Sequence, residues 1–230
     1  MTSVQPSLRP VLDDPGTAVV LVTVVKGRNQ QHQQQLADSA IRHWQSAAVR
    51  DAGRHVRAPH SMRPVALSVF VSGDGHEVLA YARHAGDGPP PTGPAAQGAG
   101  GPQWWTCRPD EPMSIPFRPY RVVRGSAEGG ATLPESFPVA FFTMDEQTSA
   151  QSWVDDMLRG EEEREGTDRD YPGAIAAHLQ VSLDGRRVLS FSEWRSEAQA
   201  AAHIADVWAP FLQRLGATGA LYRHYRTVAA

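Results

Sequence analysis

The sequence predicts an α+β protein built from two tandem repeats, each with the element order β-α-β-β-α-β. Three observations support this prediction. An Asp-Gly hairpin occurs twice, an apolar strand and a helical stretch precede each hairpin, and a strand with the pattern Tyr-Arg-x-x-Arg follows each one. Because a long repeat constrains the whole architecture, it takes precedence over local propensity.

The two hairpins are the strongest local signal. Residues 63–84 align with residues 171–194, so that Asp74-Gly75 matches Asp184-Gly185. An Asp-Gly pair between alternating, β-branched-rich runs supplies the positive backbone φ that a tight turn requires. Each segment is therefore predicted to form two antiparallel strands.

The predicted first strand and first helix of each half show the expected periodicities. The strands are TAVVLVTVV at 17–25 and FPVAFFTM at 137–144. In the first half the polar run 30–35 is expected to be the solvated start of the helix, and in the second half Thr148 or Ser149 is expected to cap it. The apolar stripes are Leu36, Ala40, Ile41, Trp44 and Ala48 in the first helix, and Trp153, Val154, Met157 and Leu158 in the second.

The second helix of each half differs. In the second half, Ser196 and Gln199 form a capping-box pattern before an apolar face that contains Trp208 and Phe211. In the first half, residues 85–103 are rich in Gly and Pro and predict a mobile loop instead. The predicted organisation is a tail (1–16), a degenerate first repeat (17–124), a linker (125–136) and a second repeat (137–230).

The composition limits the function classes. With 22 basic and 25 acidic side chains among 230 residues, the net charge of -3 excludes bulk electrostatic binding to nucleic acid or an anionic membrane. No apolar run is long enough to span a bilayer, so we expect a cytoplasmic protein. Cys107 is the lone cysteine, and no residue spacing is typical of a structural zinc site.

Residues 172–200 (PGAIAAHLQVSLDGRRVLSFSEWRSEAQA) and, more weakly, residues 69–84 (VFVSGDGHEVLAYARH) resemble the antibiotic biosynthesis monooxygenase family. The likeness is to its tandem-repeat members from aromatic polyketide pathways and covers nearly all of residues 17–228. It implies ferredoxin-like repeats packed sheet to sheet as a pseudo-dimeric α+β barrel. We expect the first repeat mainly to complete the barrel and the second to be catalytic.

The resemblance also implies a pocket between a sheet and its own helices. The family's Trp at the end of the second hairpin strand corresponds to Trp194, and its Asn four residues earlier corresponds to Ser190. In the first repeat these positions hold His84 and Ala80. The productive pocket is therefore expected in the second repeat.

Family members oxygenate polycyclic phenols or anthrones with dioxygen, without metal or haem, and some tandem members use reduced flavin from a separate reductase. The resemblance thus implies an antibiotic-pathway oxygenase that forms a quinone or cleaves a ring, either with reduced flavin as a diffusible co-substrate or with no cofactor. The alternative is a non-oxidative polyketide cyclase or a ligand-binding protein of the same fold. Oligomers of the pseudo-dimer remain open.

Period-two alternation places Ser190, Ser192 and Trp194 on one face of their strand. The predicted catalytic group is His178, Gln180, Ser190 and Trp194, converging beneath the last helix. The predicted substrate contacts are Trp153, Trp208, Phe211, Tyr222, Trp104 and Trp105. Ordinary core packing is the alternative for the aromatic residues, and an ordinary hydrogen-bonded histidine is the alternative for His178.

Overall fold

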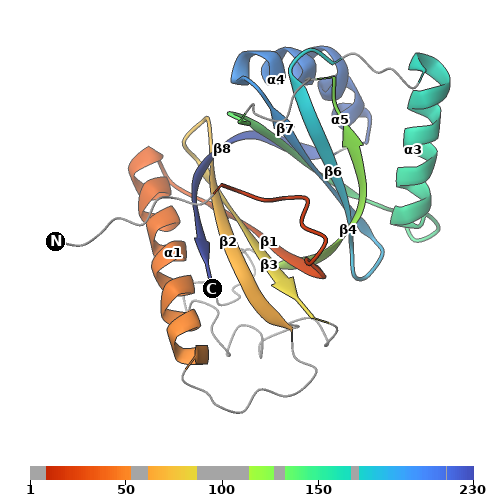
Figure 1. Cartoon of the computed structure of the whole chain (residues 1–230). Coiled ribbons are helices and arrows are strands. Elements are labelled where there is room, and N and C mark those ends of the chain that lie inside the picture. The colour runs from red at the N-terminus through yellow and green to blue at the C-terminus, as the bar shows by residue number, and fades with distance from the viewer. Residues whose placement is uncertain (1–8, 53–61, 87–113, 127–132, 167–170, 216) are drawn as a thin grey trace. The chain divides into compact units, whose positions relative to one another are not determined.

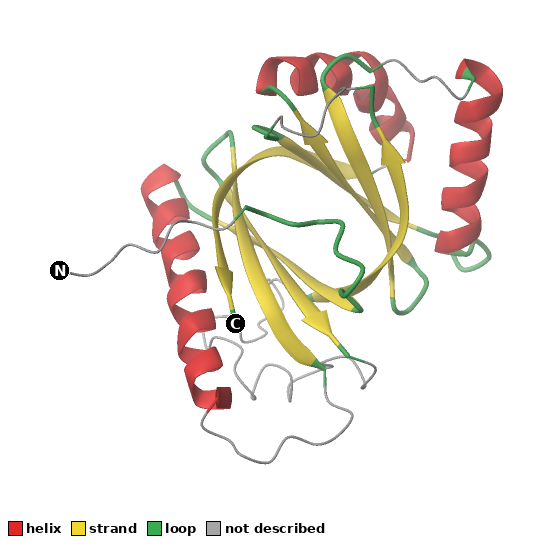
Figure 2. Cartoon of the chain, in the orientation of Figure 1, coloured by secondary structure: helices red, strands yellow, loops and turns green. Residues whose placement is uncertain are grey.

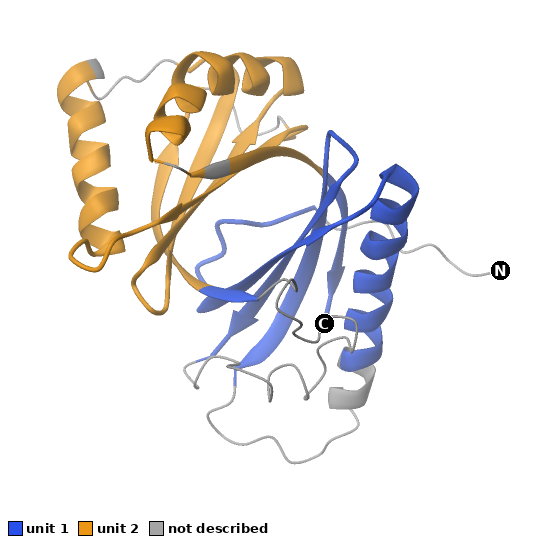
Figure 3. Cartoon of the chain, turned by 180° about the vertical axis from the view of Figure 1, so that it is seen from behind, with its two compact units in different colours: residues 1–116, 224–230 blue, residues 117–223 orange. Residues whose placement is uncertain are grey.

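The computed structural model describes residues 9–52, 62–86, 114–126, 133–166, 171–215 and 217–230. Helices and strands follow one another in the predicted order, and the α+β class with two tandem repeats is confirmed. Figure 2 distinguishes the helices from the strands. The chain forms two compact units, which Figure 3 colours separately. Unit 1 contains residues 1–116 and 224–230, and unit 2 contains residues 117–223.

In unit 1, one helix covers one face of an antiparallel sheet (Figure 1). The strand order is β1-β3-β2, and the last residues of β8 lie beside β2. The elements are β1 (Val19–Lys26), α1 (Gln30–Ala52), β2 (Arg63–Ser72), β3 (Glu77–Ala85) and the end of β8 (Thr218–Ala229). Their shared core consists of Ala37, Ala40, Ile41, Leu67, Val69, Val78 and Ala80.

In unit 2, the strand order is β8-β5-β7-β6-β4, and all helices pack on the same face of the sheet (Figure 1). The strands are β4 (Ile115–Arg124, of which 117–124 belong to this unit), β5 (Phe137–Thr143), β6 (Ala174–Ser182), β7 (Arg187–Trp194) and the start of β8. The helices are α3 (Ala150–Glu165), α4 (Glu197–His203) and α5 (Ala209–Leu215). A π-helical turn, Ile204–Trp208, joins α4 to α5.

The two predicted hairpins are confirmed and repeat each other in detail. In the first, the Ser72 hydroxyl donates to Asp74 and accepts from the Glu77 amide at 2.8 Å. In the second, Ser182 makes the same two contacts with Asp184 and the Arg187 amide. Gly75 and Gly185 adopt φ values of 81° and 71°. These are the positive φ values that the Asp-Gly pairs predict for a tight turn.

The starts of α1 and α3 differ in detail from the sequence expectation. Gln33, in the run expected to be solvated, is buried, and its side-chain amide donates to the carbonyls of Ser72 and Glu77. This is a correction: one glutamine of the run ties α1 to its hairpin. Ser149 is the N-cap of α3, as expected, but its side chain makes no capping hydrogen bond. In the preceding turn, Asp145 accepts from the Thr148 backbone amide.

A tyrosine anchors the last strand of each repeat to a helix. In unit 2, the Tyr120 hydroxyl of β4 donates to Asp155 of α3 at 2.6 Å. In unit 1, the Tyr225 hydroxyl of β8 donates to Asp38 of α1 at 2.7 Å. Tyr225, rather than Tyr222 of the predicted motif, is thus the structural counterpart of Tyr120.

Part of the predicted N-terminal tail packs on unit 1. Leu12 is buried, and Asp14 forms an ion pair with the buried Arg83 of β3. Most of the predicted loop 85–103, Trp104, Trp105 and residues 127–132 of the linker lie outside the described residues. Within the described part of the chain, no helix is both long and apolar enough to cross a membrane.

Candidate functional site

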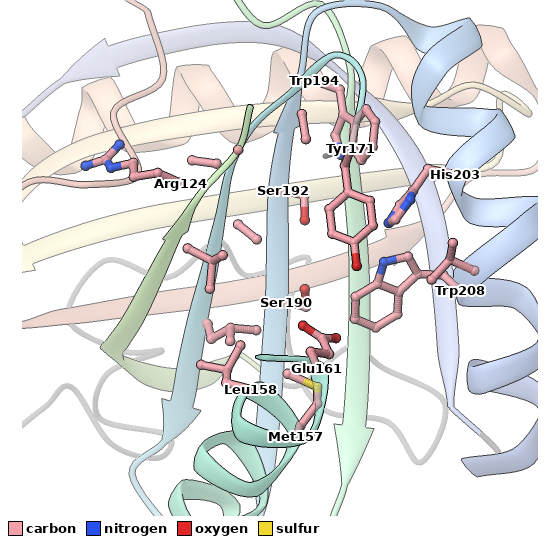
Figure 4. A pocket seen from close by; sticks show the side chains of 17 residues that line it. Arg124, Met157, Leu158, Glu161, Tyr171, Ser190, Ser192, Trp194, His203 and Trp208 are labelled. Atoms are coloured by element: carbon pink, nitrogen blue, oxygen red, sulfur yellow. The ribbon is translucent and has the colours of Figure 1, made fainter. Parts of the chain in front are cut away.

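A narrow slot separates the sheet of unit 2 from its helices (Figure 4). Strands β6 and β7 form its floor, while α3 and the π-helical turn form its sides. The slot measures about 70 Å³ and adjoins two wider clefts, which share several lining residues with it. It is lined by Val123, Arg124, Gly125, Met157, Leu158, Glu161, Tyr171, Ala174, Ala176, Ala177, Leu179, Ser190, Ser192, Trp194, His203, Val207 and Trp208.

Two serine hydroxyls lie on the floor of the slot. Ser190 and Ser192 are two residues apart on β7, so both point to the helix-covered face of the sheet. Neither hydroxyl hydrogen-bonds to another described residue, and Ser190 is 4% exposed whereas Ser192 is half-buried. A hydroxyl that faces the slot in this way can donate a hydrogen bond to, or accept one from, a polar atom of a ligand.

Aromatic rings form the walls at one end of the slot. The His203 ring lies between Tyr171 and Trp194, with centroid distances of 4.6 Å and 4.8 Å (Figure 4). Trp194 ends β7, and His203 ends α4, so the hairpin and the helix together position this stack. The Ser196 hydroxyl accepts a hydrogen bond from the backbone amide of Gln199 at 3.2 Å. Ser196 is thus the N-cap of α4, as the capping-box pattern predicts.

Trp208 joins the slot to both clefts. It belongs to the π-helical turn, a wider helical turn that often occurs at functional sites. One cleft, of about 320 Å³, runs between the last helix and strands β5 and β8. The other, of about 300 Å³, runs between α3 and α5. Together they give a flat apolar ligand room that the slot alone does not provide.

The structure does not bring His178 and Gln180 into this slot. In the β6–β7 register, His178 is opposite Phe191 and Gln180 is opposite Leu189, whereas Ser190 is opposite Leu179. Since directly opposed residues share a face, His178 and Gln180 lie on the face away from the helices. The predicted convergence is therefore wrong. The alternation of faces within each strand was predicted correctly, but the β6–β7 register places His178 and Gln180 on the sheet face opposite to that of Ser190.

His178 has its own partner on that other face. Its Nε2 lies 3.1 Å from a carboxylate oxygen of Glu193. Its Nδ1 is buried and has no hydrogen-bond partner among the described residues. The contact with Glu193 is the kind of ordinary histidine hydrogen bond that the sequence left open.

The other predicted contact residues fall into two groups. Trp208 and Phe211 line cavities. Trp153 instead packs on Phe142, with ring centroids 4.9 Å apart, and lines neither the slot nor the two clefts. Tyr222 is buried opposite Phe137 on β5 and also lines none of them. Trp104 and Trp105 lie outside the described residues.

The first repeat carries different side chains at the positions equivalent to the slot. Asp38 and Asp155 are equivalent because each accepts from the tyrosine of a last strand, and six residues later the helices carry Trp44 and Glu161. Trp44 packs edge-on against His84, with centroids 6.1 Å apart. An indole thus stands where the second repeat has a carboxylate beside its slot.

His84 itself is poorly suited to carry charge. It is 8% exposed, and burial lowers its pKa below the ordinary value, although a hydrogen bond to the Ala82 carbonyl opposes the shift. The floor positions that match Ser190 and Ser192 are Ala80 and Ala82. These two positions of the first repeat therefore offer no hydroxyl to a ligand.

Sequence reasoning missed Tyr171 and His203. Tyr171 precedes Pro172-Gly173, and Gly173 adopts a φ of 89° in the turn that leads into β6. His203 lies seven residues after the Ser196 cap, hence on a predictable face of its helix. Neither residue could be assigned to the site from sequence, because only the packing of α4 against Trp194 brings His203 and Tyr171 into the ring stack.

No group of three or more His, Cys, Asp or Glu side chains suited to a metal ion occurs among the described residues. The polar groups of the slot are instead hydroxyls, one imidazole and the peripheral Glu161 and Arg124. These groups can hydrogen-bond to an oxygen atom of an organic ligand and accept a proton from it.

No protein-family model matches the chain, and a comparison with curated proteins finds no match. Among solved structures, an anthrone oxidase-like protein aligns over 95% of both chains at 14% identity, with a TM-score of 0.62. This likeness confirms the predicted resemblance at the level of the fold.

Two further structures have lower TM-scores. A ferredoxin-fold protein related to antibiotic biosynthesis monooxygenases, from Listeria monocytogenes, is 10% identical over 92% of this chain and 97% of its own (TM-score 0.46). A monooxygenase-like protein from Listeria innocua is 11% identical over 90% and 95% (TM-score 0.45).

Proposed function

We propose that this chain is an oxygenase that oxidises a flat polycyclic phenol or anthrone in the slot of unit 2. The observation that carries the proposal is the combination of two serine hydroxyls on the slot floor, Ser190 and Ser192, with the ring stack of Tyr171, His203 and Trp194. Aromatic walls favour a planar ring, and the hydroxyls favour an oxygen substituent on that ring.

The chemistry requires a base, donors for an oxyanion and exclusion of water. We assign to His203, which stacks on the aromatic wall, the role of accepting a proton from the acidic ring carbon of an anthrone. The hydroxyls of Ser190 and Ser192 then stabilise the charge that develops on the substrate oxygen. The carbanion transfers electrons to dioxygen, so that a ring CH₂ becomes C=O and the second oxygen atom leaves as water.

We propose that this reaction needs no metal or haem. Reduced flavin from a separate reductase, as a diffusible co-substrate, is the alternative electron donor: with its two electrons, one dioxygen converts the ring CH₂ to CHOH, and the second oxygen atom leaves as water. The flat walls formed by Trp194, Tyr171 and Trp208 suit a tricyclic flavin ring as they suit the substrate. When bound, reduced flavin supplies activated dioxygen. The chain's own residues bind the ring, orient it and hold the proton.

The test is aerobic conversion of 1,8-dihydroxyanthrone, followed by quinone absorbance and dioxygen uptake, with and without reduced flavin. We expect His203→Gln to lower the rate by about a hundredfold, the range typical of a general base. The control is His76→Gln, an exposed turn residue of unit 1, which should retain the wild-type rate. Tight binding of the anthrone without dioxygen uptake would support the alternative of a cyclase or ligand-binding protein.

A further inference from the structure

The cleft between α3 and α5 combines an apolar wall with two arginines. It is about 300 Å³ in volume and shares Met157, Glu161, Tyr171, Val207 and Trp208 with the slot. Its remaining lining residues are Arg164, Pro210, Phe211 and Arg214. A ligand ring seated under Trp208 can therefore extend a substituent into this cleft.

Each arginine is held on the wall of the cleft by its own helix. The Arg214 guanidinium lies over the Phe211 ring, 5.4 Å from its centroid. The Arg164 Nε donates to the Gly160 carbonyl at 2.9 Å. Both residues occupy the last turn of their helix, so two cations from different elements face the same cleft.

Among the described residues, neither of these two arginines is held in an ion pair, and one acid lines the cleft with them. Across the described part of the chain, neither Arg164 nor Arg214 forms an ion pair, whereas Arg159 pairs with Asp156. Among the residues that line the cleft, Glu161 is the one acid. The neighbouring Glu162 and Glu163 are exposed and do not line it, which leaves an excess positive charge at the cleft.

We infer that this cleft binds a carboxylate substituent of the aromatic substrate, so that the substrate is a polycyclic aromatic acid. The inference rests on the proposed function, because it assumes that the ring system occupies the slot. Guanidinium groups match carboxylates in geometry and can bind them through two parallel hydrogen bonds.

The experiment compares two ligands that differ only in the substituent, anthraquinone-2-carboxylate and 2-(hydroxymethyl)anthraquinone. Binding is measured by quenching of tryptophan fluorescence, since Trp194 and Trp208 line the cavities. We expect the wild-type protein to bind the carboxylate about tenfold more tightly than the neutral ligand, with the preference shrinking as salt is raised. In the Arg164→Gln/Arg214→Gln double variant, the preference should be lost while the affinity for the neutral ligand is unchanged.

Two further variants separate a specific site from a change of net charge. Arg159→Gln also removes a positive charge from α3, but Arg159 does not line the cleft. The preference for the carboxylate ligand should therefore persist in this variant. Glu161→Gln removes the opposing charge and should increase the preference. Equal binding of both ligands by the wild-type protein would overturn the inference while leaving the proposed function in place. Binding of neither ligand would overturn both.

Discussion

At the scale of single residues, the two repeats differ most where their hairpins face the helices. Ser190, Ser192 and Trp194 in the second repeat correspond to Ala80, Ala82 and His84 in the first. Both hairpins have the same turn and strand register, so these side chains rather than the fold distinguish the slot floor from the equivalent positions of the first repeat.

This difference yields a prediction for the serine floor. The Ser190→Ala/Ser192→Ala variant reproduces the alanines of the first repeat and should fold normally, because that hairpin tolerates alanine at both positions. Loss of one donor to a developing oxyanion typically lowers kcat by about a hundredfold to a thousandfold. We expect a loss of at least this size in anthrone turnover, with an unchanged circular dichroism spectrum. An unchanged kcat would remove the serines from the site.

His224 gives a prediction about pH. Burial lowers its pKa to about 4, and the ring lies against Phe70 with centroids 5.6 Å apart. The neutral form is thus favoured in the folded state, while the unfolded chain binds a proton below about pH 6.5. The free energy of unfolding should therefore fall as the pH decreases from about 6.5 to 4. In urea titrations, His224→Gln should show a smaller decrease than the wild-type protein, and equal decreases would contradict this assignment.

At the scale of elements, sequence periodicity did not predict the burial of Gln33 or the tyrosine that anchors β8 to α1. Gln33 was expected to be solvated because it lies in a polar run, yet its amide lies within hydrogen-bonding distance of acceptors in the turn between β2 and β3. Similarly, Tyr222 and Tyr225 both precede an arginine, and only the pairing of β8 shows which one anchors to α1.

The role of Gln33 can be measured directly. Gln33→Leu leaves the Ser72 and Glu77 carbonyls without this donor in a buried site, a loss of about 1 to 3 kcal/mol. The exposed Gln35 is the matched control, and Gln35→Leu should change the free energy of unfolding by less than about 0.5 kcal/mol. Equal effects of the two substitutions in chemical denaturation would contradict the buried anchor.

At the scale of the whole molecule, the sequence repeats and the compact units divide the chain differently. Residues 117–124 of the first repeat belong to unit 2, where β4 pairs with β6. Residues 224–230 of the second repeat belong to unit 1. A repeat cut out at its sequence boundary therefore lacks a strand of its unit.

A fragment containing residues 131–230 should not behave as a folded monomer. Without β4, the edge of β6 exposes unpaired backbone groups, and exposed edges pair with other chains. We expect the fragment to be insoluble or to self-associate in size-exclusion chromatography with light scattering. A soluble, monomeric fragment with a dispersed NMR spectrum would contradict this expectation.

The sequence predicted the class, the order of the elements and both hairpins, because turn chemistry and periodicity are local properties. It also predicted which residues share a face within each strand. It did not predict that His178 and Ser190 lie on opposite faces, since that depends on the β6–β7 register. It missed the stacking of Tyr171 and His203 on Trp194 because tertiary packing brings these segments together.

The most direct test of the central claim is the source of the new oxygen atom in the product. Purified protein, 1,8-dihydroxyanthrone and ¹⁸O₂ should give an anthraquinone that carries one labelled oxygen, by mass spectrometry. The initial rate should exceed that of the protein-free reaction and fall toward it in the His203→Gln variant. Labelled product formed no faster than without protein would contradict an oxygenase in the slot of unit 2.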